Sequence, residues 1–155
     1  MRAFRIGRRL WFGSAIGTWQ DVEKLQALGI THIVNLRKNK HGKKLRQFRC
    51  LRLRLRDDKQ PRPKWFYRDA LSFYRQAIRS SKSKVLVMCR HGICRSASLA
   101  YFLLRASGYC PARARSIILR SRPRAIICKA YRESGERYLA AHQQRQGRTV
   151  LRGRQ

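Results

Sequence analysis

The chain has 155 residues, of which 43% are hydrophobic, so it is long enough and apolar enough to fold as one domain around a buried core. Lysine and arginine number 38 against 7 aspartate and glutamate residues, which gives a net charge of +31. The apolar content excludes a disordered chain. No apolar run approaches the ~20 residues that a membrane-spanning helix needs, and the N-terminus lacks the apolar core of a secretory signal.

A charge of this size repels itself, so we expect a polyanionic neighbour: RNA or other nucleic acid, an anionic membrane, or an acidic protein. A merely basic, solvated surface explains the composition equally well. No zinc-finger, RNA-recognition or helix-turn-helix signature points to a nucleic acid. The five cysteines favour free thiols in a reducing compartment. We therefore expect an intracellular protein, in cytoplasm or nucleus, or in a host cell or virion if a virus encodes it.

In chain order, the first predicted element is a short strand at Leu10–Phe12, closed by Gly13. Thr18 then caps a helix with acidic residues in its first turn, and Gly29 ends it in a left-handed conformation. The apolar side of this helix is predicted to consist of Val22, Leu25, Ala27 and Leu28.

The next part of the chain alternates between apolar strands and polar loops. Thr31–Leu36 predicts a buried strand, and Lys38–Lys44 a basic loop that is either solvated or a patch for nuclear import or a phosphate backbone. Cys50–Leu55 predicts a strand with its leucines inward and its arginines outward. The two prolines and two aspartates of residues 57–63 predict a loop.

The second half of the sequence predicts four helices and one strand. The predicted elements are a helix with Phe66, Ala70, Phe73, Ala77 and Ile78 on one face, a strand at Val85–Met88, a helix at Arg95–Ser107 stopped by Gly108, a helix from Pro111 to about Leu119, and a last helix from Ile126. This alternation predicts an α/β domain with a mainly parallel central sheet flanked by helices. The domain is expected to span residues 1–142, followed by a basic polar tail at 143–155.

The segment from Cys89 to Ser96 contains the residues that we expect to bind an anion and to react. It joins a strand through a glycine-bearing turn to a helix N-terminus, so backbone N–H groups and the helix dipole converge on one anion-binding point. The same field favours the thiolate form of the Cys89 sulfur, which makes it a nucleophile. The phosphate-binding loop (P-loop) is expected to consist of Arg90, His91, Gly92, Ile93, Cys94 and Arg95.

Several other residues of this segment are expected to serve phosphate-ester hydrolysis. Arg95 is expected to clamp two phosphoryl oxygens with its planar guanidinium, and Gly92 to permit the tight turn. Ser96 is expected to donate a hydrogen bond to the thiolate, to cap the helix, or both. Cys94 is either a partner for a protective disulfide with Cys89 or a plain small residue in the turn.

Spacing alone is weak evidence here, because 28 arginines and five cysteines yield about one Cys-x5-Arg pair by chance. Cys50 and Arg56 form such a pair. They lie in a segment with strand periodicity, without a glycine and without a following helix, so their N–H groups are expected to bond within a sheet.

Phosphate-ester hydrolysis also needs a general acid to protonate the leaving oxygen. Acidic residues are few, and Asp57 and Asp58 lie together at a strand end in a loop that can close over a pocket. Ordinary turn residues are the alternative for this pair.

These segments resemble the small dual-specificity phosphatases of the cysteine-based protein tyrosine phosphatase superfamily. The resemblance runs from about Leu10 to Tyr138 and depends on residues 10–15, 28–36 and 89–98. It implies the fold of that superfamily, a phosphocysteine intermediate, no metal or other cofactor, and phosphoprotein substrates carrying phosphotyrosine or phosphoserine and phosphothreonine. It also implies that Asp57, 32 residues before Cys89, is the general acid.

The chain departs from the family at three places. Met88 replaces the histidine that usually precedes the nucleophile, and Cys128 lies where an asparagine is often found. The pair His91-Gly92 resembles the RNA 5′-triphosphatase branch, although Arg95-Ser96-Ala97 follows the protein phosphatases. An RNA 5′-phosphatase and a weakly active phosphate-binding or nucleic-acid-binding module therefore remain the alternatives. Nothing in the sequence indicates an oligomeric state.

Overall fold

The structure, a computed structural model, describes the backbone of residues 1–39 and 42–152 and the side chains up to Gln143. Its elements are β1 (Ala3–Arg5), β2 (Leu10–Gly13), α1 (Trp19–Ala27), β3 (His32–Asn35), the 3-10 helix η1 (Lys43–Gln47), β4 (Arg49–Arg52), α2 (Lys64–Ala77), β5 (Val85–Met88), α3 (Arg95–Ala106), α4 (Pro111–Ser121) and α5 (Lys129–Arg152). The α/β fold with a mainly parallel sheet is confirmed.

The five strands form one sheet in the order β1-β2-β5-β3-β4. All neighbours run parallel except β1, which pairs antiparallel with β2. Strand β5 is central, and each of its four residues is buried. Because β2, β3 and β5 are parallel and in register, their carboxyl ends lie at one edge of the sheet, where α/β folds bind their ligands.

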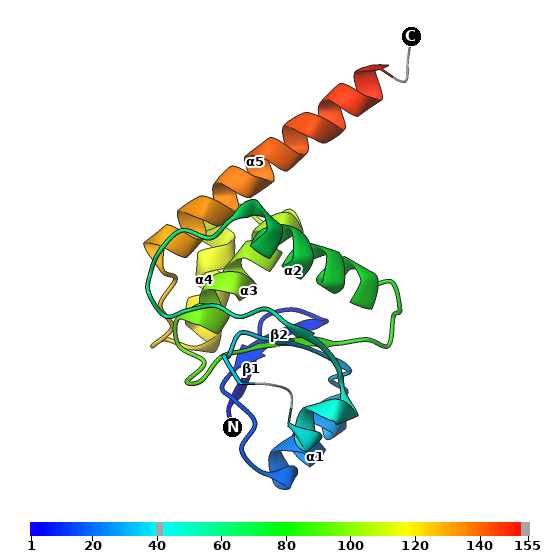
Figure 1. The fold of residues 1–155 in the computed structure, drawn as a ribbon, viewed down its shortest axis with the longest axis vertical. Coiled ribbons are helices and arrows are strands. Elements are labelled where there is room, and N and C mark those ends of the chain that lie inside the picture. The colour runs from blue at the N-terminus through cyan, green and yellow to red at the C-terminus, as the bar shows by residue number, and fades with distance from the viewer. Residues whose placement is uncertain (40–41, 153–155) are drawn as a thin grey trace.

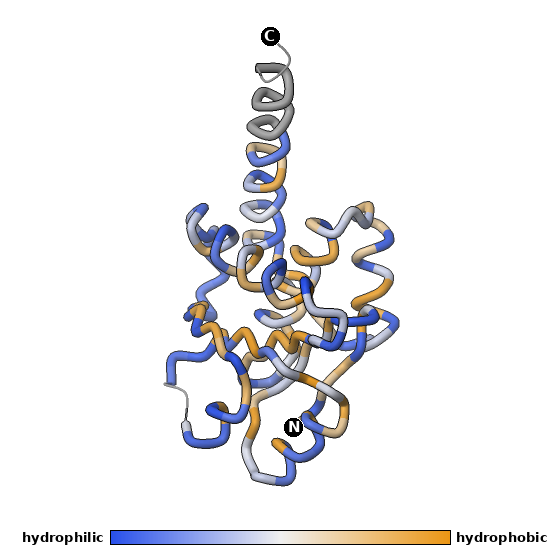
Figure 2. Tube along the Cα trace, turned by 90° about the vertical axis from the view of Figure 1, so that its right-hand side faces the viewer, coloured by the Kyte–Doolittle hydropathy of each residue, from blue (hydrophilic) through white to orange (hydrophobic). Residues whose placement is uncertain are grey.

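Helices cover both faces of the sheet (Figure 1). Helices α2 to α5 pack on one face around a large core that includes Phe12, Val87 and Leu103. Helix α1 and η1 cover the other face, where Val22, Leu25 and Leu86 form a smaller core. Figure 2 shows the apolar segments gathered where sheet and helices meet, with the polar ones at the periphery.

Several predicted elements differ from the structure in their bounds. Strand β4 ends at Arg52, although Leu53 and Leu55 are buried and their N–H groups still bond to the carbonyls of Asn35 and Leu36. The predicted leucine-in, arginine-out alternation of this segment is therefore confirmed beyond the strand itself. In the basic loop, Lys43 and Lys44 belong to η1, whereas Lys40 and His41 lie outside the described residues.

The first strand and the first helix also differ from the prediction. Strand β1 was not predicted, because it is only three residues long and depends on β2 for pairing. On α1, Val22 and Leu25 are buried as predicted, but Ala27 and Leu28 are exposed.

Helix α5 begins at Lys129 rather than Ile126, because the N–H of Ile126 bonds to the carbonyl of Ile93. It continues to Arg152 and extends away from the body of the molecule (Figure 1), so most of the predicted tail is helical; residues 153–155 lie outside the described part. Among the described residues, no helix is long and apolar enough to cross a membrane.

Candidate active site

Cys89 directly follows the central strand, at the carboxyl edge of the sheet. Its side chain is buried, with 2% of the residue exposed, and its own N–H bonds to the Gly13 carbonyl at 3.2 Å. Two groups contact its sulfur: the backbone N–H of Gly92 donates to Sγ at 3.2 Å, and Oγ of Ser96 lies 3.2 Å from it. The sulfur is thus positioned by the strand before it and by two hydrogen-bonding groups after it.

The loop from Arg90 to Cys94 curls back over this sulfur. Gly92 has a φ of +64°, and a Cβ there would lie 2.5 Å from the Gly13 carbonyl carbon, so only glycine fits. The N–H groups of His91, Ile93, Cys94 and Arg95 donate to no acceptor among the described residues. They are available to an anion at the N-terminus of α3, where the helix dipole adds positive potential.

Arg95 is the first residue of α3 and lies between Cys89 and the loop after β4. Its side chain is 14% exposed, and Nη1 donates to the Leu55 carbonyl at 3.2 Å. Its Nε lies 3.6 Å from Oδ2 of Asp57. The structure therefore brings Asp57 to Arg95, across more than 30 residues of chain.

The two neighbouring aspartates have different surroundings. Asp57 has a side chain that is 54% exposed and contacts only Arg95 among the described ionic partners. Asp58 pairs instead with Arg62 and accepts the N–H of Gln60 at 3.1 Å. Asp58 is thus engaged within its own loop, whereas Asp57 faces Arg95.

The comparisons with known proteins agree with this geometry. The family model for the dual specificity phosphatase catalytic domain matches residues 10–133. The chain belongs to the dual specificity phosphatase family. It is a cysteine-based dual-specificity protein phosphatase, as the sequence predicted.

Solved structures show the same fold. A mouse protein assigned to the dual specificity phosphatases and complexed with zinc tungstate is 25% identical, with a TM-score of 0.78 over 92% of this chain and 89% of that one. Human DUSP28 is 23% identical, with a TM-score of 0.77 over 92% and 99% of the two chains. PTPMT1 is 16% identical, with a TM-score of 0.80 over 95% and 99%.

Tyr131, on α5 of the phosphatase, was missed in the sequence. Its hydroxyl donates to the Arg56 carbonyl at 2.7 Å and accepts the N–H of Lys59 at 3.0 Å. These bonds bracket Asp57 and Asp58, so Tyr131 holds the aspartate loop in place. A tyrosine more than 70 residues away leaves no local signal of this role.

Arg122 is a second residue whose place the sequence did not show. Its Nη1 is buried with no hydrogen-bond partner among the described residues, and its guanidinium lies 4.7 Å from the ring of Phe4. Burial lowers its pKa from the usual arginine value, and the nearby Arg2 lowers it further, while Cys89 acts in the opposite direction. Arg122 is thus a largely buried cation that packs on Phe4 and has one guanidinium nitrogen without a partner among the described residues.

The remaining predicted residues of the phosphate-binding loop have clear positions. Arg90 and His91 are exposed, and the Arg90 carbonyl accepts the N–H of Ala15 at 3.3 Å. Cys94 is half-buried as a free thiol, and burial raises its pKa to about 11. Met88 is fully buried in the smaller core, so a hydrophobic contact replaces the polar side chain usual before the nucleophile.

Proposed function

We propose that this phosphatase hydrolyses phosphate monoesters of proteins, on tyrosine and on serine or threonine, through a phosphocysteine intermediate. The observation that carries the proposal is the cluster at Cys89: its sulfur lies 3.2 Å from both Gly92 N and Ser96 Oγ, and Asp57 lies 3.6 Å from Arg95 beside it. The tungstate complex of the mouse relative supports it, because tungstate is a tetrahedral oxyanion like phosphate.

In the first step the Cys89 thiolate attacks phosphorus, and the bond from phosphorus to the ester oxygen breaks. The free N–H groups of the loop and the guanidinium of Arg95 bind the three non-bridging oxygens, where charge gathers in the transition state. Asp57, protonated, transfers its proton to the departing oxygen, which leaves as an alcohol or phenol.

In the second step water attacks the phosphocysteine. Asp57, now a carboxylate, accepts a proton from that water, and the sulfur–phosphorus bond breaks to release phosphate. The thiolate is the leaving group, and a hydrogen bond from the Ser96 hydroxyl at 3.2 Å stabilises its charge. The step restores the enzyme to its starting state.

One observation favours a second candidate, an RNA 5′-phosphatase with the same chemistry. With 38 basic against 7 acidic residues, the chain attracts any polyphosphate, and its binding to RNA would weaken steeply with salt. A weakly active domain that binds phosphorylated or nucleic-acid partners is the third candidate.

A substrate panel at two salt concentrations tests the proposal. We expect wild-type protein to hydrolyse p-nitrophenyl phosphate and phosphopeptides, and Cys89→Ser to abolish turnover while retaining phosphopeptide binding. Cys110→Ser is the matched control, because Cys110 is an exposed free thiol outside the site. Turnover of triphosphorylated RNA alone, with a steep salt dependence, would overturn the proposal in favour of RNA. Binding without any turnover would leave only the third candidate.

A further inference from the structure

A groove between α2 and α5 lies outside the Cys89 site, and no step of the proposed reaction uses it. One part of the groove is a cavity of about 310 Å³ lined by Lys64, Trp65, Arg68, Tyr138, Ala141 and His142. A second cavity of about 250 Å³ shares three lining residues with the first and extends along α2 to Arg75 and Arg79. The two cavities therefore form one continuous groove, which both helices line.

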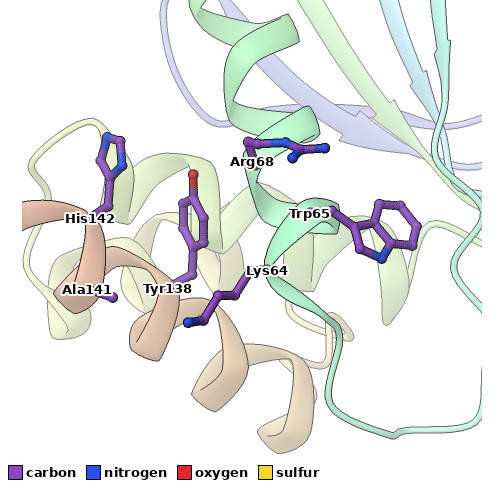
Figure 3. A pocket seen from close by; sticks show the side chains of 6 residues that line it. All are labelled: Lys64, Trp65, Arg68, Tyr138, Ala141 and His142. Atoms are coloured by element: carbon purple, nitrogen blue, oxygen red, sulfur yellow. The ribbon is translucent and has the colours of Figure 1, made fainter. Parts of the chain in front are cut away.

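Aromatic rings make up much of the lining of the first cavity. In Figure 3, Trp65 of α2 and Tyr138 of α5 lie on either side of two basic side chains, with His142 beyond Tyr138. The rings of Tyr138 and His142 are stacked, with centroids 5.7 Å apart and planes at 12°. Trp65 is 50% exposed, so its ring is accessible to a ligand. Among the described lining residues of this cavity only Ala141 is aliphatic, so its walls are suited to a flat ring.

The two helices that line the groove are packed on the same core. The ring of Tyr138 packs against two core rings, with centroids 6.1 Å from Tyr67 and 6.0 Å from Phe102. Helix α5 approaches these rings closely, because a Cβ on Gly135 would lie 3.0 Å from the ring of Phe102. The groove is therefore part of the packed fold and does not depend on a loop.

Four basic side chains, called here the basic stripe, follow α2 along the groove. Lys64, Arg68, Arg75 and Arg79 recur at intervals of four or seven residues, which places them on one face of the helix, and all four are exposed. At a rise of 1.5 Å per residue the stripe is about 22 Å long. Arg68 pairs with Asp69 at 2.8 Å, and both partners are exposed, whereas the other three form no ion pair with a described carboxylate. No described lining residue of either cavity is acidic, so the groove attracts a chain of negative charges.

We propose that the groove between α2 and α5 binds single-stranded nucleic acid, with the phosphates along the basic stripe and the bases against Trp65 and Tyr138. Single strands bind where cations follow the backbone and flat rings stack on the bases. Arginine suits both tasks, because its guanidinium forms paired hydrogen bonds to phosphate oxygens and stacks on rings. An acidic protein segment would match the charge, but its apolar anchors would meet rings and a single alanine instead of an aliphatic pocket. The inference adds a binding function outside the Cys89 site.

Binding of an RNA of about 8 nucleotides with a 3′-fluorescein label, measured by fluorescence anisotropy, tests the proposal. The RNA carries a 5′-hydroxyl, so it offers no terminal phosphate ester to the catalytic site. We expect Arg68→Ala/Arg75→Ala and Trp65→Ala each to raise Kd about tenfold or more, and the wild-type Kd to rise steeply between 50 and 200 mM NaCl. The matched control is Arg113→Ala/Arg115→Ala on α4, which removes the same charge from exposed positions outside the groove and is expected to retain the wild-type Kd. All variants are expected to hydrolyse p-nitrophenyl phosphate like wild type, since none of them alters the catalytic site.

Tryptophan emission gives a second measurement, because a base that stacks on an indole changes its emission. Unlabelled RNA is expected to quench the emission of the wild-type protein and to quench Trp65→Phe much less. A glutamate-rich peptide with the same number of charges is expected to bind more weakly than the RNA. Single-stranded DNA of the same sequence is expected to bind about as tightly as RNA, since the proposed contacts are to phosphates and bases.

Three results decide the proposal. Equal Kd values in wild type and both groove variants, or an equal loss in the α4 control, would overturn it. Tighter binding of the acidic peptide than of RNA, lost in the groove variants, would also overturn it and assign the groove to a protein partner. Binding of RNA without binding of DNA, with the same sensitivity to the groove variants, would support the groove and limit its ligand to RNA. The proposed function is tested separately by phosphopeptide hydrolysis, so it stands or fails independently of these results.

Discussion

At the scale of single residues, identical side chains differ by what they contact. Asp57 and Asp58 are adjacent, but one faces Arg95 at the site and the other is held by Arg62. The five cysteines differ in the same way. Burial raises the pKa of Cys50 and of Cys94 to about 11, so both thiols stay protonated near neutral pH, whereas the sulfur of Cys89 receives the N–H of Gly92. Contacts with neighbouring groups therefore distinguish side chains of the same type.

This difference predicts the outcome of two matched substitutions. Asp57→Ala is expected to lower kcat for phosphoserine peptides by about 10²–10⁴-fold, because an alkoxide leaves poorly without a proton donor. The loss should be much smaller for p-nitrophenyl phosphate, whose leaving group needs little protonation. Asp58→Ala is the control, expected to stay within about threefold in steady-state kinetics. Equal losses in both variants would contradict the assignment of Asp57.

At the scale of elements, the aspartate loop depends on α5. The hydroxyl of Tyr131 bonds to the backbone on both sides of the two aspartates, and Oγ of Ser134 accepts the N–H of Arg62 at 3.2 Å. The loop that supplies Asp57 is therefore positioned by a helix from the end of the domain. Its hydrogen bonds allow a loop without secondary structure to hold Asp57 beside Arg95.

Tyr131→Phe removes the hydroxyl from this connection and preserves the ring. We expect kcat for phosphoserine peptides to fall by about tenfold, because each buried hydrogen bond contributes about 1 kcal/mol to holding the loop. KM should change little, since the phosphate-binding loop is untouched. Tyr109→Phe, at an exposed position, provides the control. Unchanged kcat in Tyr131→Phe would show that the loop is positioned without the Tyr131 hydroxyl.

A carboxylate on helix α1, that of Asp21, leads to a separate prediction about stability. Burial acts to raise the pKa of Asp21, but hydrogen bonds from the N–H groups of Gly17 and Thr18, together with the N-terminal ammonium 3.2 Å away, outweigh it and lower the pKa to about 2. The ionised form is thus favoured in the folded state. Its stabilisation is fully present above the unfolded value near 4 and is lost as pH falls from about 4 to 2.

Asp21→Asn should therefore destabilise the protein by about 2 kcal/mol at pH 6, and the difference from wild type should shrink toward pH 2. Urea unfolding at several pH values measures it. Glu23→Gln is the control on the same helix, because Glu23 is exposed. A difference that does not depend on pH would mean that the Asp21 carboxylate is not the source of the stabilisation.

At the scale of the whole molecule, the dominant feature is the net charge of +31. The described ion pairs use only a few of the 38 basic side chains, so most of the positive charge is balanced by solution ions alone. Self-repulsion on this scale lowers the stability of a compact state. Salt screens it, because the Debye length falls from about 10 Å at 0.1 M to a few ångströms near 1 M.

We accordingly expect Tm to rise by about 2–8 °C between 50 and 500 mM NaCl, measured by circular dichroism. Glycine betaine at matched osmolality does not screen charge and is expected to raise Tm less. A Tm that is flat or falls across the salt series would mean that the positive charges are spaced too far apart to repel each other appreciably.

The sequence predicted much of the fold and the centre of the site. Cys89, Gly92, Arg95 and Ser96 lie within eight residues, so one strand, one turn and one helix start determine their mutual geometry. Helix and strand periodicity identified every element of the central sheet except β1. That strand is three residues long and exists only because its backbone pairs with β2.

Long-range contacts decided the rest. Tyr131 and Arg122 come from different segments, and their positions depend on contacts with distant residues that no periodicity records. The beginning of α5 likewise depends on a bond between Ile126 and Ile93.

The local backbone was therefore determined by the amino-acid sequence itself: Cys89, the turn at Gly92 and the start of α3 follow one another directly after β5, so their mutual geometry is local. Only the tertiary structure decided which aspartate faces Arg95 and which helix holds the aspartate loop. The physical reason is that hydrogen bonds and ion pairs between distant segments exist only after the core has packed those segments together.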